Sequence, residues 1–221
     1  MLSAFPVSRK SYWYFSCYFV LYLLILFFNR TIHTLSRPQA KALEEKYIGD
    51  LWAVKELRSV LMNKQEIYDQ FTAAGIPFEV TEHEAVYTME DLAQVKLAHP
   101  EAEAKNLFVR DDKKQHYYLI TVPGDKRVDL KLFQKQQGLR KLSFASSDDL
   151  MTLLALTPGA VTPLGLLNDP EHRVELYLDQ SFENRLISIH PNDNTATVCL
   201  ETSALVQILT NYGCIVHMTQ I

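Results

Sequence analysis

The apolar positions of this chain alternate between helical spacing and short extended runs. In 63–74, Ile67 and Phe71 recur on one side of a helix that Gly75 ends. Segments such as 117–122 are almost wholly apolar and are bounded by polar turns, which is typical of strands. The pattern predicts helices at 63–74, 88–95, 129–137, 148–156 and 203–212, and strands at 77–83, 106–109, 117–122, 142–145, 174–178, 186–190, 195–200 and 215–218.

The predicted strands are more numerous than a simple alternation of strand and helix would give. The charged turn DDKKQ joins 106–109 to 117–122 as a hairpin, and the tight turn PNDN joins 186–190 to 195–200. No internal repeat and no low-complexity tract interrupts this order. We therefore expect an α+β fold, with a mixed, partly closed β-sheet or barrel flanked by helices.

One segment, TPGAVTPLGLLND at 157–169, departs from both patterns. Pro158 and Pro163 each lack an N–H and fix φ, so this segment should not run as a helix or a central strand, and we expect a stiff loop. Gly159 lets the main chain approach a ligand closely, and the N–H groups of 159–162 could converge on an anion or a polarised carbonyl. The alternative is a rigid turn between a helix and a strand.

The N-terminal region contains an uncharged apolar run, SYWYFSCYFVLYLLILFF at 11–28, with basic residues on both sides. Its length is at the short end for a membrane-spanning helix, and no small-residue cleavage pattern follows it. Two interpretations stand: an N-terminal membrane anchor, or an upstream extension ahead of a true start at Met62. In both, 1–61 is an extension separate from a globular domain at 62–221.

Charge is unevenly distributed along the chain. The formal net charge is −4, and 62–221 carries 14 Lys plus Arg against 22 Asp plus Glu. Within that range, 105–141 holds ten basic and four acidic residues, so a basic stretch lies on an acidic body. Such a patch can hold a phosphate backbone in one place, and the alternative is a solvated face near a hairpin.

The usual catalytic and metal-binding signatures are missing from the sequence. It has no G-x-S-x-G, H-E-x-x-H, C-x-x-C, Walker or G-x-G-x-x-G motif, and its seven histidines have no metal-ligand spacing. We therefore expect no metal and no cofactor. Three cysteines are too few for a disulfide framework, which favours a reducing compartment, hence the cytoplasm or the cytoplasmic face of a membrane.

Three polar features remain at the ends of apolar segments. They are Lys105 with Asn106 before the strand LFV, the loop around Gly159, and His190 before the turn PNDN. Each alone is ordinary, since a lysine at the mouth of a strand is usually solvated and a histidine at a turn is usually only a turn residue. Their joint occurrence is what indicates a site.

Four strings carry these features in a fixed order: AKNLFVRD at 104–111, RKLSFAS at 140–146, TPGAVTPLGLLND at 157–169 and ISIHPNDNTATV at 187–198. Together they resemble the YbaK/prolyl-tRNA-synthetase-associated editing family, in its free-standing branch similar to the alanyl-tRNA(Pro) deacylases. The resemblance runs from about Met62 to the C-terminus, and 1–61 has no counterpart in it. It implies a mixed, barrel-like domain that hydrolyses the ester joining a wrong amino acid to the terminal ribose of tRNA.

The resemblance assigns roles residue by residue. Lys105 and Asn106 fall on the pair that holds the terminal adenosine, and His190 falls on the histidine next to the aminoacyl pocket. The G-x-x-x-P loop that lines this pocket consists of Gly159, Ala160, Val161, Thr162 and Pro163. The positions implicated in contacting the acceptor stem are Arg110 and Arg140, with Lys141 beside them.

The chemistry of ester hydrolysis agrees with these roles. Negative charge develops on the carbonyl oxygen, so the N–H groups of Gly159 and Ala160 are candidate oxyanion donors. Water can attack without a protein nucleophile when the loop and the free ribose hydroxyl position it. Lys105 would pair with a phosphate or ribose oxygen, and His190 would orient water or shape the pocket. Lys105, Gly159 and His190 are thus the expected catalytic residues.

The side chains of the loop predict the amino acid that is removed. Ala160, Val161 and Thr162 would form a small wall that suits an alanine methyl better than a proline ring, because a clash rejects a larger side chain easily. The expected partner is mischarged Ala-tRNA(Pro), cleaved in trans, with cysteine as the second choice of amino acid. The rival function is a non-catalytic RNA- or nucleotide-binding module. An anchor at 11–28 would add membrane association.

Overall fold

The structure is a computed structural model that describes residues 61–86 and 95–221. Leu61–Ile221 forms one compact unit. The apolar segment at 11–28 and all but the last residue of the helix expected at 88–95 lie outside the described residues. Within the described ranges, no helix combines the length and the apolar character needed to cross a bilayer.

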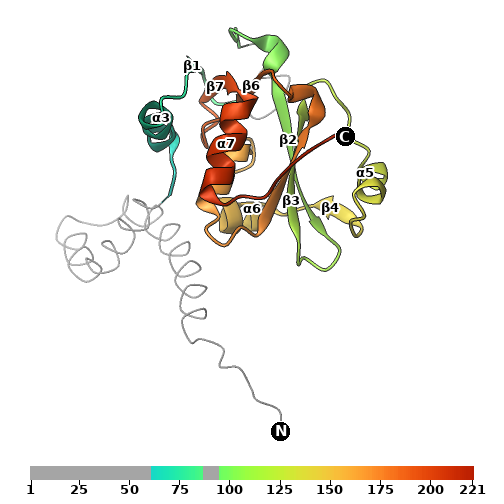
Figure 1. Ribbon diagram of the computed structural model, residues 1–221. Helices are drawn as coiled ribbons and strands as arrows, with labels where there is room; N and C mark the ends of the chain where they lie inside the picture. The colour runs from blue at the N-terminus through green and yellow to red at the C-terminus, as the bar shows by residue number, and fades with distance from the viewer. Residues whose placement is uncertain (1–60, 87–94) are drawn as a thin grey trace, which may run out of the picture. The chain divides into compact units, whose positions relative to one another are not determined.

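The described strands form two sheets (Figure 1). One sheet has five strands in the order β4-β2-β3-β5-β8, and the other has three in the order β1-β7-β6. In the larger sheet β2 pairs antiparallel with β3 and β4, whereas β5 pairs parallel with β3 and β8. The strands are β1 (Phe78–Glu82), β2 (Ala104–Asp111), β3 (Tyr117–Pro123), β4 (Leu142–Phe144), β5 (Val174–Asp179), β6 (Leu186–Ile189), β7 (Ala196–Glu201) and β8 (Val216–Thr219).

The two sheets are joined at one point. An isolated parallel bridge links Glu103, which directly precedes β2, to Ser188 of β6. The expected α+β class, with a mixed sheet and flanking helices, is confirmed. The described strands do not close into a barrel, because the larger sheet ends at β4 and β8 and the smaller one at β1 and β6.

Local chemistry explains where the helices begin and end. Asn63 and Ser146 start two of them with capping boxes, in which the cap side chain and a carboxylate three residues on exchange hydrogen bonds with the backbone. Gly213 ends the last helix at φ 100°, in the left-handed region that favours glycine. The helices are α3 (Lys64–Ala73), α5 (Leu130–Gln136), α6 (Ser147–Leu154) and α7 (Thr202–Tyr212), with 3₁₀ turns η2 (Pro100–Ala102), η3 (Pro163–Asn168) and η4 (Gln180–Phe182).

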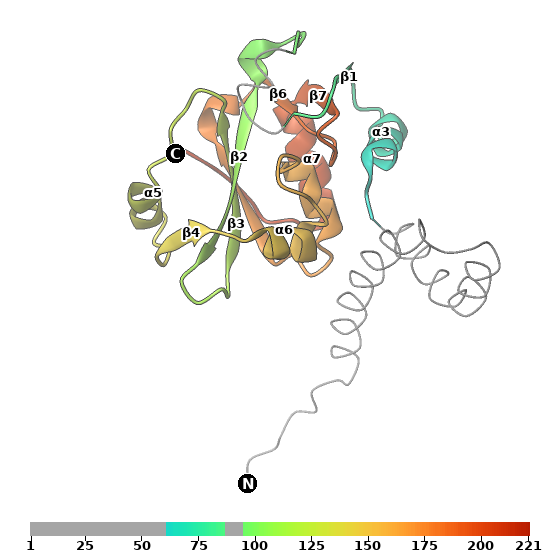
Figure 2. The same ribbon diagram turned by 180° about the vertical axis from the view of Figure 1, so that it is seen from behind.

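Two hydrophobic clusters lie on the two faces of the five-stranded sheet. The larger cluster packs Ala104 and Phe108 of β2 against α3, α6, η3, α7 and the three-stranded sheet. The smaller cluster packs Val109 of β2 and Tyr177 of β5 against Phe133 of α5. Figures 1 and 2 show α5 and α7 on opposite sides of β2 and β3. Because side chains alternate along a strand, β2 contributes to both clusters.

The segment 157–169 corrects one expectation. Its second half is helical, since η3 begins at Pro163 with Thr162 as its N-cap. The prediction that the prolines exclude a helix was wrong here, because proline at the first turn loses no intrahelical hydrogen bond and already has a helical φ. A Cβ at Gly165 would lie 2.5 Å from the Leu156 side chain, so this glycine lets η3 pack closely. The true loop is 157–162.

Candidate functional site

The loop 157–162 closes on itself through a tight turn. The Ala160 N–H donates to the carbonyl oxygen of Thr157 at 3.0 Å, and Gly159 has φ 92°, which a residue with a side chain adopts only under strain. The Ala160 N–H is therefore committed to the turn, which corrects its expected role as an oxyanion donor. The Gly159 N–H has no acceptor among the described residues, and neither do the N–H groups of Val161 and Thr162, so Gly159 is one of the donors that the loop offers.

Thr162 and Pro163 connect the loop to η3 as its N-cap and its first residue. Both side chains are buried, and Thr162 caps η3 by accepting a hydrogen bond from the Leu164 N–H at 3.4 Å. The Thr162 carbonyl oxygen also accepts from the Gly165 N–H at 3.1 Å. Of the five loop residues expected to line the pocket, these two are thus part of the packing around η3, whereas Gly159 and Val161 are partly exposed.

Asn106 joins β2 to this loop. Its Nδ2 donates to the carbonyl oxygen of Val161 at 2.9 Å, and its Oδ1 accepts from the Thr121 hydroxyl at 2.7 Å. Thr121 is fully buried and lies opposite Asn106 in the β2–β3 pairing. The structure therefore brings two of the predicted features together. Thr121 was missed, although a hydroxyl in the apolar strand YYLITV is a signal that sequence reading could have used.

Lys105 lies on the other face of the sheet. It alternates with Asn106 along β2 and pairs with Val122, which belongs to the cluster under α5. Its Nζ donates to the carbonyl oxygen of Gly124 at 3.2 Å and to that of Lys126. The adjacent pair thus does not line one pocket: Asn106 contacts the Gly159 loop, and Lys105 holds the turn after β3.

The turn held by Lys105 is anchored a second time by an ion pair. Lys126 Nζ lies 2.7 Å from Oδ2 of Asp179, a carboxylate that is almost fully buried. Burial opposes ionisation of Asp179, but hydrogen bonds from Lys126 and Ser181 outweigh it, so the pKa of this carboxyl lies below its usual value. The charged form of Asp179 is therefore the stable one at neutral pH.

His190 follows β6 and has one nitrogen committed to the backbone. Its Nδ1 lies 2.8 Å from the carbonyl oxygen of Ala196, which assigns the ring proton to Nδ1 and leaves Nε2 as an acceptor. Burial lowers the pKa of His190, and the nearby His83 acts in the same direction. The His83 and His190 ring centroids are 6.0 Å apart. His190 is therefore neutral near pH 7, with Nε2 able to accept a proton.

The turn after His190 connects it to η3. Asn192 donates from Nδ2 to the carbonyl oxygen of Met62 at 2.6 Å, and a longer contact of 3.5 Å reaches the carbonyl oxygen of Leu164. No hydrogen bond joins His190 itself to 159–163 among the described residues. The turn after His190 and the loop thus both lie next to η3, with no hydrogen bond between His190 and 159–163.

The three residues expected to contact the acceptor stem differ in exposure. Arg110 is paired with Asp149, which also accepts from the Tyr117 hydroxyl at 3.1 Å, and the Arg110 side chain is only 18% exposed. Arg140 Nε lies 2.8 Å from Asp112 at the hairpin turn. Lys141 is exposed. Arg110 therefore holds β2 to α6, and Lys141 is the one that faces solvent freely.

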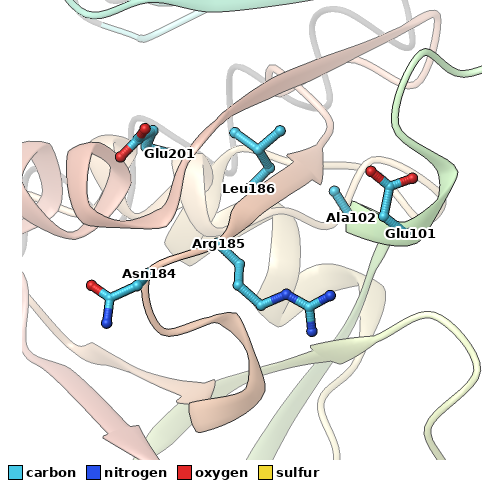
Figure 3. A pocket seen from close by; sticks show the side chains of 6 residues that line it. All are labelled: Glu101, Ala102, Asn184, Arg185, Leu186 and Glu201. Atoms are coloured by element: carbon cyan, nitrogen blue, oxygen red, sulfur yellow. The ribbon is translucent and has the colours of Figure 1, made fainter.

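A separate pocket of about 270 Å³ contains none of the predicted residues. Figure 3 shows the Arg185 guanidinium extending toward the side formed by η2, away from Asn184. The residues that line this pocket are Glu101, Ala102, Asn184, Arg185, Leu186 and Glu201. It lies at the start of β6, whereas His190 lies beyond the end of that strand.

Comparison with known proteins shows which family this chain is similar to. The model of the aminoacyl-tRNA editing domain matches residues 83–208. "Prolyl-tRNA editing protein ProX" of Acetoanaerobium sticklandii is 39% identical over 151 residues, covering 68% of this chain and 92% of that protein. "Prolyl-tRNA synthetase associated domain-containing protein 1" of Mus musculus is 33% identical over 142 residues, covering 62% of this chain and 83% of that protein.

A solved structure supports the fold independently. The crystal structure of a hypothetical protein superposes with a TM-score of 0.52 at 18% identity, covering 70% of this chain and 97% of the other. At that identity the likeness concerns the fold alone. The family match and the sequence relatives together show that the chain belongs to the aminoacyl-tRNA editing domain family.

Proposed function

We propose that this chain is a trans-acting deacylase that hydrolyses the ester of mischarged tRNA(Pro), and that alanine is the amino acid it removes. Family membership and the names of the relatives support the reaction class. The observation that carries the proposal is the hydrogen bond from Asn106 to the Val161 carbonyl oxygen, which holds β2 against the loop carrying Gly159. The N-terminal part of β2 and the loop that offers the Gly159 N–H are thus held together.

The proposed chemistry uses water as the nucleophile. Its oxygen bonds to the ester carbonyl carbon while the Gly159 N–H stabilises the negative charge on the carbonyl oxygen, an effect worth about 10²- to 10³-fold in rate. The water proton passes to Nε2 of His190, whose Nδ1 is fixed by the Ala196 carbonyl. When the bond to the ribose oxygen breaks, that proton passes to the leaving oxygen. The products are free amino acid and uncharged tRNA.

Lys105 has a positioning role in this proposal. Its ammonium group holds the Gly124 and Lys126 carbonyls on the face opposite to Asn106. It therefore fixes the end of β3, whose Thr121 orients the Asn106 amide. The expected direct contact with a phosphate or ribose oxygen would require it to exchange these carbonyl partners.

Specificity is proposed to come from the size of the loop wall. Ala160 is buried against the turn and Val161 is held by Asn106, so the wall is short and its backbone is tied. A tied backbone cannot retreat to admit a proline ring, whereas a methyl needs little room. Cysteine is the second choice, because discrimination by one methylene in an apolar pocket is worth only about 1–3 kcal/mol, and the cysteine side chain is only slightly larger than that of alanine.

The reducing cytoplasm is the proposed location of this activity. Cys199 and Cys214 are both buried free thiols, as in proteins that do not depend on disulfides.

The test is a deacylation panel with the full chain. Alanyl-, cysteinyl-, seryl- and prolyl-tRNA(Pro), each labelled in the amino acid, are incubated with the wild-type chain and with Asn106→Ala. A matched control is Gln207→Ala, which changes an exposed polar residue of α7. We expect release of alanine to be fastest, and at least 100-fold slower in Asn106→Ala than in the control.

Two outcomes would overturn parts of this proposal. Faster release of cysteine or serine than of alanine would retain the reaction and replace the substrate. Absence of any release from a folded chain that still binds tRNA would favour the non-catalytic RNA-binding module.

A further inference from the structure

The structure sorts the basic residues of 105–141 into two groups. Lys105, Arg110, Lys126 and Arg140 are engaged with backbone carbonyls or carboxylates of the domain. The remaining six are exposed and have no ion-pair partner among the described residues: Lys113, Lys114, Arg127, Lys131, Lys135 and Lys141. The net positive charge of this stretch is therefore displayed at the surface by the second group.

Two large apolar side chains are exposed among these lysines. Phe144 of β4 is 63% exposed and Leu132 of α5 is 54% exposed, the highest values among the large hydrophobic residues that the structure describes. Leu142, on the same strand as Phe144, is buried. β4 is thus anchored by the Leu142 side chain and presents the Phe144 ring to solvent, where a ligand or partner can reach it.

The elements carrying these residues are physically connected. The Leu142 N–H donates to the Gln134 side chain of α5 at 2.9 Å, and Arg140 ties the start of β4 to Asp112 at the hairpin turn. Figures 1 and 2 both show α5 and β4 side by side. We call the exposed set formed by Lys131, Leu132, Lys135, Lys141 and Phe144 the α5–β4 surface.

We propose that the α5–β4 surface docks the acceptor end of an RNA, with an unpaired base stacked on Phe144 and phosphates contacting Lys131, Lys135 and Lys141. The proposal rests on the deacylase function above and states where the rest of that substrate lies. An exposed aromatic ring between lysines matches single-stranded nucleic acid, because every base has a face that can stack and every nucleotide carries a negative charge.

The location of β4 next to β2 connects this surface to the candidate site. The Ala145 N–H donates to the carbonyl oxygen of Phe108 at 3.0 Å. Asn106 lies two residues before Phe108 in β2, about 7 Å away at ~3.3 Å per residue. β4 is the edge strand of its sheet, so a single strand of RNA can pass around this edge from the Phe144 side to the Asn106 side. One tRNA end is thus able to occupy both places.

Charge on the rest of the domain argues for this one surface. Outside 105–141, residues 62–221 hold four basic and eighteen acidic residues, so other faces repel a phosphate backbone. Within the α5–β4 surface, the neighbouring Asp112 is paired with Arg140, and Asp129 accepts the N–H groups of Lys131 and Leu132 as the α5 cap. The acidic groups nearby are therefore already engaged, and the lysines are available to a ligand.

The test measures binding of fluorescently labelled, uncharged tRNA(Pro) to the full chain by anisotropy, over a range of salt concentrations. Phe144→Ala should weaken binding about tenfold, within the range of stacking on one base, without changing the salt slope. Phe144→Tyr should bind like wild type, because it keeps the ring. A triple variant, with Lys131, Lys135 and Lys141 changed to alanine, should reduce the slope of log K against log salt by about 2.

The control is Tyr212→Ala, which removes an exposed aromatic side chain from α7, on the other side of the sheet. Unchanged tRNA binding by Phe144→Ala, with its melting temperature retained, would overturn the proposal. So would a Phe144-dependent loss of binding to anionic phospholipid vesicles without a loss of tRNA binding, since that result identifies a membrane surface.

Kinetics separate this inference from the proposed function. In a working deacylase, Phe144→Ala should raise KM about tenfold and leave kcat unchanged. If the wild-type chain binds tRNA in a Phe144-dependent way but releases no amino acid, the docking surface stands and the deacylase function fails. If it releases alanine at the same KM in both forms, the function stands and the docking surface fails.

Discussion

The two faces of strand β2 carry neighbouring polar residues, Lys105 and Asn106, that bind different parts of the domain. On one face, Asn106 links the buried Thr121 hydroxyl to the Val161 carbonyl of the Gly159 loop. On the other, Lys105 is bound to the carbonyls of Gly124 and Lys126. The residues are adjacent in the sequence, but the alternation of a strand separates their side chains by the thickness of the sheet. A sequence motif of adjacent residues is therefore not evidence of one shared pocket.

The difference also has an energetic side. Removal of Asn106 would leave a buried hydroxyl and a carbonyl without their partners, at a cost of about 1–3 kcal/mol each in a buried setting. Lys105 donates to backbone carbonyls of a surface turn, where water can replace it in part. We expect the Asn106 face to be the more sensitive to mutation.

The largest expected effect is that of Asn106→Ala. It should lower kcat/KM for alanyl-tRNA(Pro) at least 100-fold, about 2.7 kcal/mol in transition-state stabilisation, because the Gly159 loop loses its tie to β2. Single-turnover deacylation measures this effect. Asn106→Asp is the sharper companion, since it keeps an acceptor for Thr121 and removes the donor to Val161. If that variant keeps wild-type activity, the tie to the loop is not what matters.

Lys105→Ala should have a smaller effect, about tenfold in kcat/KM, because the amine acts through the 124–126 turn. Lys105→Arg should restore part of the loss, since a guanidinium can also donate to two carbonyls. Deacylation rates for the three forms at equal tRNA concentration give the comparison. A Lys105 variant as inactive as Asn106→Ala would show that the lysine contacts substrate directly, as the family resemblance implied.

Gly159→Ala should lower activity severalfold and stability by about 1 kcal/mol, because φ 92° strains any residue with a Cβ. Gly138→Ala is the matched control: its φ is 66°, and nothing lies within 4 Å of the added Cβ. Urea denaturation should show similar losses of stability in both variants. Only the Gly159 variant should lose deacylation beyond its fraction unfolded, and equal activities would remove Gly159 from the site.

The smallest expected effect is in the pH dependence set by His190. Burial lowers the pKa of His190 in the folded chain relative to the unfolded chain, so as the pH falls through the ordinary histidine range the unfolded chain binds more protons and stability decreases. His190→Gln should therefore lose less stability than wild type between pH 7 and pH 5, measured by urea denaturation. The exposed His116→Gln serves as control. Parallel pH profiles for wild type and His190→Gln would contradict a buried, neutral His190.

The sequence predicted the secondary structure of the described residues well. Every helix and strand expected there is present, with ends displaced by at most two residues. Caps and turns such as Asn63, Ser146, Gly213 and PNDN act locally, so their effect can be read without the fold. The three 3₁₀ turns η2, η3 and η4 were not predicted, and at η3 Pro163 begins a helix that the two prolines seemed to exclude.

The candidate site was predicted in part. The union of Asn106 with the 157–162 loop follows expectation, because both motifs lie at the ends of apolar segments. The orientation of Lys105, the pairing of Arg110 with Asp149 and the commitment of the Ala160 N–H were not foreseeable. Each depends on a partner between 3 and 39 residues away, and a single sequence does not show which partners meet.

The sequence by itself determined the local elements, the basic stretch from Lys105 to Lys141 and the family that the chain belongs to. Only the tertiary structure decided which of those basic residues hold the domain together and which face solvent beside Phe144. The physical reason is that charge is a property of a residue, whereas its availability depends on the carboxylates and carbonyls that the fold brings within hydrogen-bonding distance.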